Sequence, residues 1–237
     1  MKINLKLIKK VEIANGTMAF HLEKPKDLDF RAGQFCDIRL INPPETDDEG
    51  DIRGFSIASA PYESDIVVAT RMRDTAFKRV LKGLAIGSTV EFDGPYGDFT
   101  LHKTEATPAV FIIGGIGVTP VRSMIAQATH DQTMHNLTLI HSSRTPADLP
   151  YMSDFLNFAN KNDKFNYIPV ASDSIPDDWR GESGRIDIEM AKKYVVDLEK
   201  PIYYLSGPEG MVKAMRQMLV DASVNEDNIR TEEFSGY

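Results

Sequence analysis

A glycine-rich stretch near the middle of the chain has the residue types and spacing of an anion-binding turn. An apolar run that ends at Ile113 predicts a short buried strand. Three glycines follow it: Gly114, Gly115 and Gly117. Because they have no Cβ, their backbone can be approached closely. Thr119 is expected to N-cap the next helix, with Pro120 in its first position. Free amides and the helix dipole would then converge on one anion site.

This stretch departs from the dinucleotide fingerprint GxGxxG. Pro120 stands where the last glycine would be, and no acidic residue obviously fills the ribose-binding role. A glycine-rich turn by itself is a plain structural turn about as often as it is a cofactor site. Whether this turn binds a cofactor is therefore inferred from the elements around it.

Residues 1–104 predict an all-β domain. Gly, Pro and Asn-Gly turns separate six candidate strands: Ile3–Ile13, Thr17–Leu22, Gln34–Ile41, Arg53–Ala58, Asp65–Met72 and Ser88–Phe92. Strands at this spacing predict a six-stranded antiparallel barrel. A single helix is expected at Ala76–Leu84.

Residues 105–237 predict an α/β domain. Candidate strands lie at Ala109–Ile113, Leu137–His141, Phe165–Val170 and Ile202–Ser206. Candidate helices alternate with them at Pro120–His130, Tyr151–Asn160, Asp187–Val196 and Glu209–Ala222. This alternation predicts a doubly wound parallel sheet, whose ligands bind at the carboxyl ends of the strands. Ser206-Gly207-Pro208 forms a second turn at such an end, and the barrel beside the sheet predicts a cleft between the domains.

Composition excludes several classes of function. The net charge of −8 argues against nucleic acid as a partner, and no apolar run is long enough for a membrane span. Cys36 is the single cysteine, which excludes a Cys-ligated iron–sulfur cluster and indicates a cytoplasmic protein. The five histidines lack metal-ligand spacing, so no metal site is predicted; His130 and His135 are expected at the surface. The acidic run Glu45–Asp51 is expected to be a solvated loop.

Five motifs occur in one order along the chain: Arg53-Gly-Phe-Ser56, Gly94-Pro-Tyr-Gly97, Gly114–Pro120, Ser206–Met211 and Glu232–Tyr237. Together they resemble the ferredoxin–NADP reductase superfamily over essentially the whole chain. The resemblance implies an FAD-binding barrel, an NAD(P)-binding α/β domain and an NAD(P)H-dependent flavoprotein oxidoreductase. It implies FAD and either NADPH or NADH as cofactors.

The resemblance assigns the flavin site to the barrel. Arg53 would bind the pyrophosphate, Phe55 would lie against the flavin ring system, and Ser56 would hydrogen-bond flavin N5. The family's usual tyrosine is Phe55 here, which removes one hydroxyl. The remaining implied flavin contacts are Gly54, Thr70, Arg71, Met72, Thr75, Ala76, Phe77 and Lys78. Thr75 can cap the helix at Ala76–Leu84, but the family's glycine-containing version of this loop is missing, which leaves FMN open.

The nicotinamide dinucleotide is assigned to the second domain. Its pyrophosphate would lie on the turn with Gly115, Gly117, Thr119 and Pro120. Ser206, Gly207 and Pro208 would lie next to the carbon that transfers hydride, with serine in place of the family's cysteine. Ser142, Ser143 and Arg144 follow a strand where the adenosine ribose is expected, and favour a 2′-phosphate. Tyr151 is a candidate adenine contact.

The aromatic tail resembles members in which a terminal aromatic ring shields the flavin. Either Phe234 or Tyr237 would stack there, and a frayed tail is the alternative. Glu233, with Ser56, is a candidate for protonating flavin N5. Ser56, Ser206 and Glu233 are therefore the predicted catalytic residues.

Hydride would pass from NAD(P)H to flavin, and electrons would leave to a separate partner such as a ferredoxin, a flavodoxin-like protein, an oxygenase component or a small oxidant. Two alternatives stay open: an NAD(P)H:flavin reductase that uses free flavin as substrate, and a non-turnover electron-transfer subunit of a larger complex. Oligomeric state is left open.

Replacing Arg144 with Ala is expected to raise the KM for NADPH about tenfold, because a charge-assisted hydrogen bond to the 2′-phosphate is lost. The KM for NADH, which lacks that phosphate, serves as the control in the same variant. Steady-state kinetics with the two nucleotides measure the difference. Equal changes for both would remove Arg144 from a 2′-phosphate site.

Overall fold

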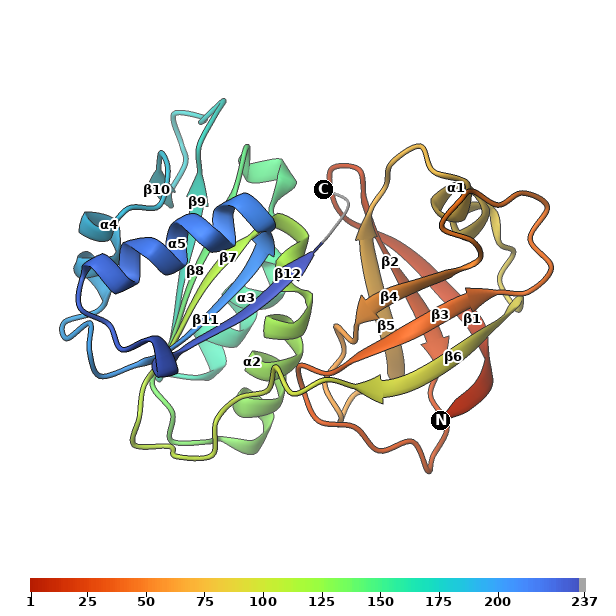
Figure 1. Cartoon of the computed structure of the whole chain (residues 1–237), viewed down its shortest axis with the longest axis horizontal. Helices are drawn as coiled ribbons and strands as arrows, with labels where there is room; N and C mark the ends of the chain where they lie inside the picture. Colours follow the sequence, from red (N-terminus) through yellow and green to blue (C-terminus); the bar gives the residue numbers. More distant parts are fainter. Residues whose placement is uncertain (235–237) are drawn as a thin grey trace.

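A computed structural model describes residues 1–234 of the chain, which form two lobes side by side (Figure 1). The N-terminal lobe is an antiparallel sheet of β1 (Lys2–Ala14), β2 (Thr17–Glu23), β3 (Phe35–Leu40), β4 (Ile52–Ser56), β5 (Asp65–Arg71) and β6 (Thr89–Tyr96). Its six strands run in the order β4-β3-β6-β1-β2-β5. The single helix α1 (Ala76–Gly83) begins where the sequence predicts it.

Alternation of side chains builds the core of this lobe. On β3, Cys36, Ile38 and Leu40 are buried, while the residues between them are half-buried. Phe20 on β2 and Phe92 on β6 lie fully buried in the same core cluster. This period of two is the pattern of a sheet that covers its core on one face.

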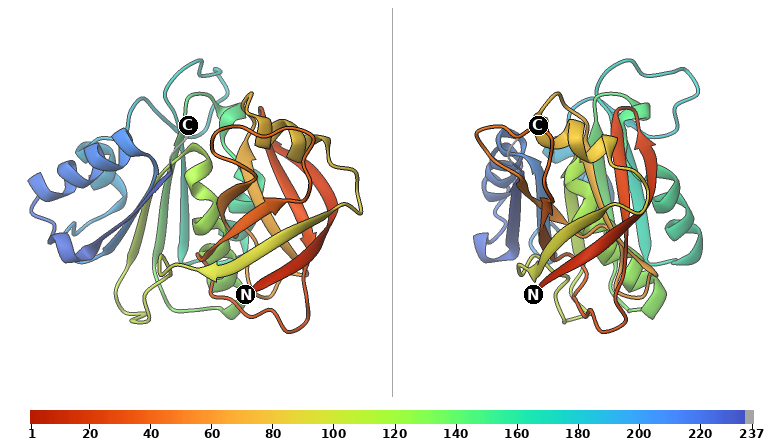
Figure 2. Two further views of the ribbon diagram at one scale, coloured as in Figure 1. Left: turned by 45° about the vertical axis from the view of Figure 1, so that its right-hand side comes forward. Right: turned by 90° about the vertical axis from the view of Figure 1, so that its right-hand side faces the viewer.

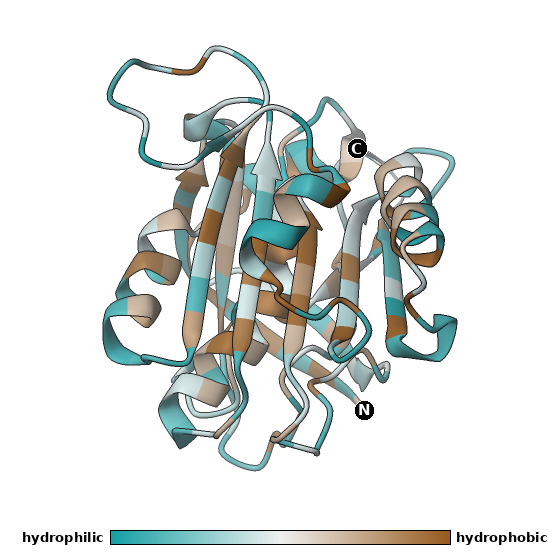
Figure 3. Cartoon of the chain, turned by 90° about the vertical axis from the view of Figure 1, so that its left-hand side faces the viewer, coloured by the Kyte–Doolittle hydropathy of each residue, from teal (hydrophilic) through white to brown (hydrophobic). Residues whose placement is uncertain are grey.

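The C-terminal lobe is a parallel sheet of β7 (Ala109–Gly114), β8 (Leu137–Ser143), β9 (Phe165–Ala171), β10 (Glu182–Ser183), β11 (Ile202–Pro208) and β12 (Ile229–Phe234). Their order is β10-β9-β8-β7-β11-β12. All residues of β7 are buried, as the continuous apolar run predicts. In Figure 3 the strands of this sheet show long brown, hydrophobic stretches between more polar helices.

Helices cover both faces of the parallel sheet, which confirms the doubly wound arrangement. α2 (Thr119–Asp131) and α3 (Met152–Lys161) pack on the face toward the barrel, and they share a core with barrel residues such as Val67 and Ala69. α4 (Ile188–Tyr194) and α5 (Glu209–Asp221) pack on the other face. The side views show α5 on the side of the sheet away from the barrel (Figure 2).

Two local predictions are wrong. Thr119 is not an N-cap: a 3₁₀ turn, η1 (Gly115–Val118), leads directly into α2, and Thr119 donates its hydroxyl hydrogen to the Ile116 carbonyl oxygen (3.1 Å). His135 is buried, because its Nε2 meets the His102 carbonyl oxygen (2.9 Å) inside the connection between the lobes. The alternative of a frayed tail does not hold as far as Phe234, since β12 pairs in parallel with β11.

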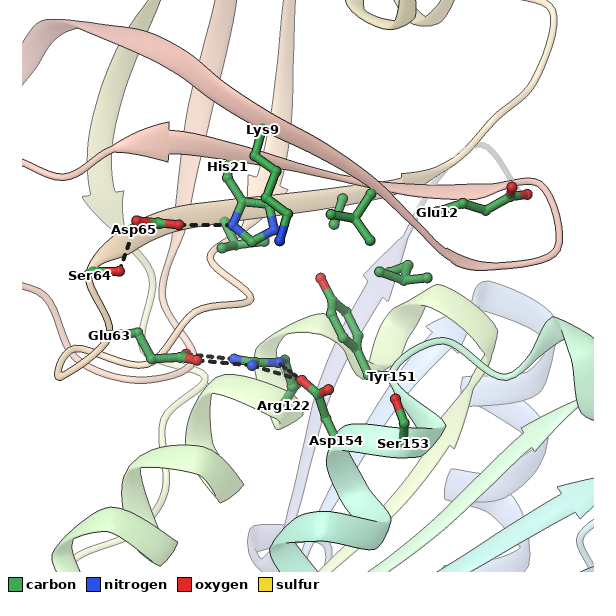
Figure 4. A pocket seen from close by; sticks show the side chains of 14 residues that line it. Lys9, Glu12, His21, Glu63, Ser64, Asp65, Arg122, Tyr151, Ser153 and Asp154 are labelled. Carbon is green, nitrogen blue, oxygen red and sulfur yellow. Dashed lines mark hydrogen bonds and ion pairs between the residues drawn. The ribbon is translucent and has the colours of Figure 1, made fainter. Parts of the chain in front are cut away.

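One arginine of α2 joins the two lobes. Arg122 makes a bidentate ion pair with Glu63 of the barrel (2.6 and 3.0 Å) and contacts Asp154 of α3 (2.8 Å). It also donates to the Ala58 carbonyl oxygen (3.0 Å). Figure 4 shows this ion-pair group beside Tyr151. Burial and charge oppose each other here, and the two carboxylates raise the pKa of Arg122 in spite of its burial.

Replacing Arg122 with Ala is expected to lower the free energy of unfolding by about 3 kcal/mol, because Glu63 and Asp154 lose the cation that compensates their partial burial. Urea unfolding measures the change. Lys192→Ala is the control, since its ion pair with Glu189 is exposed and contributes much less. An Arg122→Ala variant as stable as this control would show that the ion pairs do not hold the lobes.

Candidate functional site

A cleft of ≈ 510 Å³ lies between the lobes. The barrel contributes β4, β5 and the start of α1, and the α/β lobe contributes the start of α2 and the end of β12. Eleven residues predicted from the sequence to act at the cofactor site line it: Arg53, Gly54, Phe55, Ser56, Thr70, Arg71, Thr75, Lys78, Thr119, Glu233 and Phe234. Segments far apart in the sequence are thus brought together.

One part of the cleft is cationic. Arg53, Arg71, Arg73 and Lys78 all line it. The Lys78 ammonium donates to the Arg71 carbonyl oxygen (2.9 Å), and its pKa is lowered by burial and then by Arg73 and Arg53. An anion would relieve this repulsion between like charges. Thr75 caps α1 as predicted, accepting a hydrogen bond from the Lys78 amide (3.4 Å).

A buried carboxyl also lines the cleft. Burial, and then the charge of Asp98, raise the pKa of Glu232 from 4.5 to about 7. Its Oε2 is buried and has no hydrogen-bond partner among the described residues. The hydroxyl-bearing Ser56 lines the same cleft and is itself buried. Glu232 is therefore a proton-holding group at neutral pH.

The sequence predicted the neighbouring Glu233 for this role, and Glu233 also lines the cleft but is exposed on β12. Side chains alternate along a strand, so Arg230, Glu232 and Phe234 share the half-buried face. Arg230 on that face donates to the Thr100 carbonyl oxygen of the connection between the lobes (3.0 Å). The period of two in this segment was a usable signal, but only if the segment is taken as a strand.

The side chains of three predicted flavin contacts point into the barrel core and do not line the cleft. Ala76 and Phe77 are buried in the barrel core, and Met72 packs against that core, because these residues form the apolar side of α1 and its approach. Phe55 does line the cleft, but its ring is mostly buried and lies 6.0 Å from the ring of Phe77. Only a small part of the Phe55 ring is thus available to a ligand.

The two glycine turns of the α/β lobe touch each other. A Cβ on Gly117 would lie 2.7 Å from the Gly207 nitrogen, and one on Gly207 would lie 3.0 Å from the Gly114 nitrogen. Gly207 also has a φ of +147°. Both turns therefore need glycine for the approach of their backbones. Pro120 is buried behind them.

Other predicted residues lie at the same carboxyl edge. Ser206 on β11 pairs in register with Glu232, and its Oγ is buried with no partner among the described residues. Pro208 ends β11. Ser142 pairs in register with Gly114, which places Ser142, Ser143 and the exposed Arg144 beside the glycine turn. None of these residues lines the cleft, so their nucleotide roles stay predictions.

A buried histidine forms a hydrogen bond with the backbone of the glycine turn. His141 of β8 approaches the Gly115 carbonyl oxygen with its Nε2 (3.0 Å). Burial lowers the pKa of His141 to about 4, so the ring is neutral at pH 7 and the Nε2–H form donates to that carbonyl. Gly115 has a φ of +50°, and this hydrogen bond holds it there. No pattern in the sequence indicates this contact.

A second cavity of ≈ 340 Å³ lies between the lobes and shares no lining residue with the cleft. Tyr151 lines it and is 7% exposed, which removes this ring from the predicted adenine contact. Figure 4 shows the Tyr151 hydroxyl pointing toward the barrel strands that carry Lys9 and His21.

Residues 1–234 contain neither a metal cluster nor a membrane-spanning helix. No group of three or more His, Cys, Asp or Glu side chains in this range could hold a metal ion. No helix there is long and apolar enough to cross a membrane. Tyr237, the other candidate for stacking on flavin, lies outside the described residues.

The donor set of the cleft fits FAD. Clustered cations and the capped N-terminus of α1 suit a pyrophosphate. The apolar side chains of Phe35, Ala69 and Ile116 suit a flat ring system. Glu232 and Ser56 supply polar groups beside them.

Both lobes match known domain families. Residues 4–101 match the oxidoreductase FAD-binding domain, and residues 111–217 match the oxidoreductase NAD-binding domain. One curated relative is a component of the Na⁺-translocating NADH-quinone reductase of Haemophilus influenzae, 32% identical over 205 residues, which are 80% of this chain and 50% of the relative. The reductase component of propane 2-monooxygenase of Mycolicibacterium smegmatis is 28% identical, over 90% of this chain and 61% of the relative. The chain thus spans about half to three fifths of these relatives.

Solved structures share the fold of the whole chain. A cytochrome P450 reductase from Amycolatopsis has a TM-score of 0.83 and 26% identity, covering 98% of this chain and 70% of that one. A ferredoxin–NADP⁺ reductase from Neisseria gonorrhoeae with bound FAD and NADP has a TM-score of 0.81 and 21% identity, covering 98% of both chains.

Glu232→Gln is expected to change how stability depends on pH. The folded-state pKa of about 7 lies above the ordinary 4.5, so the native state binds the extra proton between these values. Wild-type stability therefore falls as pH rises from about 4.5 to about 7. Gln cannot ionise, so the free energy of unfolding of the variant should not fall in this way. Relative to the wild type it should rise by ~2 kcal/mol between about pH 5 and pH 8, after allowance for partial exposure.

Urea unfolding at the two pH values measures this gain. Glu233→Gln, at the exposed neighbouring position, is the matched control and should show a much smaller pH-dependent change. A stability difference between Glu232→Gln and wild type that is the same at both pH values would contradict the raised pKa.

Proposed function

We propose that this chain, which belongs to the ferredoxin–NADP reductase superfamily and has FAD- and NAD-binding domains, is an NAD(P)H-dependent flavoprotein oxidoreductase that passes the electrons to a separate acceptor. The observation that carries the proposal is the cleft between the lobes. It joins a cationic end, a proton-holding carboxyl and the start of the nucleotide-binding helix.

FAD held in this cleft would supply the hydride-accepting and electron-transferring chemistry, which no side chain of the protein provides. We assign its phosphates to Arg71, Arg73, Lys78 and Arg53, together with the N-terminus of α1. Phe35 and Phe234 line the cleft and give it an apolar surface. The Ser56 hydroxyl offers a hydrogen bond within the same space.

Glu232 is proposed as the residue that holds and moves the proton, in place of Glu233. Its Oε2 is buried without a partner among the described residues and its pKa is about 7, so it can both give and take a proton at neutral pH. Ser206, its register neighbour on β11, is a polar group without redox chemistry at the same edge.

The nicotinamide dinucleotide is proposed to lie along the carboxyl edge of the parallel sheet. The two turns that Gly117 and Gly207 hold together place the start of α2 at this edge for its pyrophosphate, and Thr119 reaches the cleft where the two cofactors would meet. The exposed Arg144 supports NADPH, whereas the name of one relative, a component of an NADH-quinone reductase, supports NADH.

The acceptor is proposed to be a protein component. One relative is the reductase component of a monooxygenase and another belongs to a quinone reductase of several subunits. A free-flavin reductase is the second candidate, and the engagement of Arg53 by carboxylates of its own lobe favours it. A cytoplasmic location and the domain boundary at residues 104/105 stay predictions.

Anaerobic stopped-flow reduction of the purified chain by NADPH and by NADH in turn tests the proposal. Yellow protein whose bound flavin is bleached by one nucleotide, and is then reoxidised by added ferredoxin or flavodoxin, is the expected result. Colourless protein that instead reduces added FMN would transfer the assignment to a free-flavin reductase. Failure of both nucleotides to reduce any flavin would contradict both.

A further inference from the structure

The acidic loop between β3 and β4 is not a freely solvated segment, as its composition suggested. Four carboxylates lie in the run from Glu45 to Glu49, and three of them are bound to arginines. Glu45 pairs with Arg79 on α1, whereas Asp47 and Glu49 both pair with Arg53. The loop is thus held against the side of the barrel that carries the cationic end of the cleft.

These contacts occupy every nitrogen of the Arg53 guanidinium. Nη2 donates to Asp47 Oδ1 (2.6 Å), and Nε lies 2.9 Å from Glu49 Oε2. Nη1 lies within 3.0 Å of three carbonyl oxygens, those of Glu49, Gly50 and Ile52. The hydrogen bond from Arg53 is also the main reason that the pKa of Asp47 is lowered.

A guanidinium used in this way resembles one that has already bound an anion. Arginine recognises carboxylate and phosphate with the same planar fork. Both Arg53 and Glu49 line the cleft. By contrast, Arg71 and Arg73, which also line it, make no ion pair among residues 1–234. The cleft therefore has open cations and one cation whose counter-ions are built in.

We propose that Asp47 and Glu49 are internal anions that compete with the flavin phosphate for Arg53, and thereby determine how tightly phosphorylated flavins are held. The proposal rests on the proposed function, in which this cleft holds the flavin. The two carboxylates are specificity-determining residues. They weaken the binding of FAD and FMN, and they leave the binding of riboflavin, which has no phosphate, unaffected.

The exposure of the carboxylates makes this exchange feasible. The Glu49 side chain is 78% exposed and that of Asp47 is 31% exposed, whereas Arg53 is 20% exposed. Exposed ion pairs are weak, because water and salt replace them readily. The pyrophosphate of FAD brings a comparable charge and several acceptor oxygens to the same fork, so it can displace them. The side chains of Asp47 and Glu49 then release Nη2 and Nε of Arg53, while the carbonyl contacts of Nη1 remain.

The loop contains its own control. Asp48 lies between the two carboxylates, is exposed, and makes no hydrogen bond or ion pair among the described residues. Asp48→Asn removes one negative charge from the same loop without releasing Arg53, and it is charge-matched to the single variant Asp47→Asn. It separates competition for Arg53 from the general repulsion between an acidic loop and a phosphate.

The experiment measures flavin release from the purified full chain. Release of FAD after dilution is followed by its fluorescence in wild type, Asp48→Asn and the double variant Asp47→Asn/Glu49→Gln. The double variant is expected to release FAD roughly tenfold more slowly, because two weak competing ion pairs are gone. Asp48→Asn should stay close to the wild type. Equilibrium titration with riboflavin should give the same Kd for all three proteins.

Several outcomes would overturn the proposal. FAD release that is unchanged or faster in the double variant would show that the carboxylates position Arg53 instead of competing for it. An equal gain in Asp48→Asn, or an equal change for riboflavin, would show a general effect of charge or folding. The single variant Asp47→Asn answers the same question if the double variant does not fold. A wild type that binds no flavin at all would instead contradict the proposed function itself.

Discussion

The contact of two backbone turns at the carboxyl edge of the parallel sheet is the constraint on which the site depends. Gly117 and Gly207 approach so closely that a Cβ on the first would lie 2.7 Å from the backbone of the second. A side chain at either position would push the start of α2 away from β11. The position of α2 in turn sets where Ile116 and Thr119 reach the cleft. A nucleotide turn and one wall of the flavin cleft are thus built by the same close packing.

The connection between the lobes fixes the other wall. The hydroxyl of Tyr204 on β11 contacts the His102 ring (3.0 Å), and Arg230 of β12 donates to the same hydroxyl (3.2 Å). A second contact between the lobes is made by Arg122 of α2, which pairs with Glu63 of the barrel and Asp154 of α3. Because β12 is held by these bonds at its start, its end with Glu232 and Phe234 is directed along the barrel. Rigid placement suits a site whose function is to keep two ring systems in register.

The cleft separates its charges by function. Cations gather around the start of α1, where burial and then like-charge repulsion lower the pKa of Lys78. The carboxyl of Glu232 lies where burial favours its protonated form. A phosphate and a protonated carboxyl therefore each have a place in which the surroundings favour them. The acidic loop adds negative charge at the cationic end. It lowers the positive potential around Arg53 but leaves Arg71 and Arg73 without an ion pair among the described residues.

Local pattern in the sequence determined much of this protein. The turn residues between short strands predicted the barrel, the alternation of strands and helices predicted the parallel sheet, and Thr75 was recognisable as the cap of α1. On α2, Val121, Met124, Ile125 and Ala128 follow the i, i+3, i+4, i+7 spacing of one helix face, and all four are buried. Each of these depends on neighbours within a few residues, which the order of the chain contains directly.

Only the tertiary structure decided the features that join distant segments. Glu232 is the buried carboxyl because β12 pairs with β11. This pairing directs the face of β12 that carries Glu232 toward the barrel. The acidic loop acquired partners because folding brings Arg53 and Arg79 beside it, and His135 is buried because the connection between the lobes covers it. Composition supplies a charge or an apolar surface but not its partner, since a contact between residues far apart in sequence exists only once the chain has closed the loop between them.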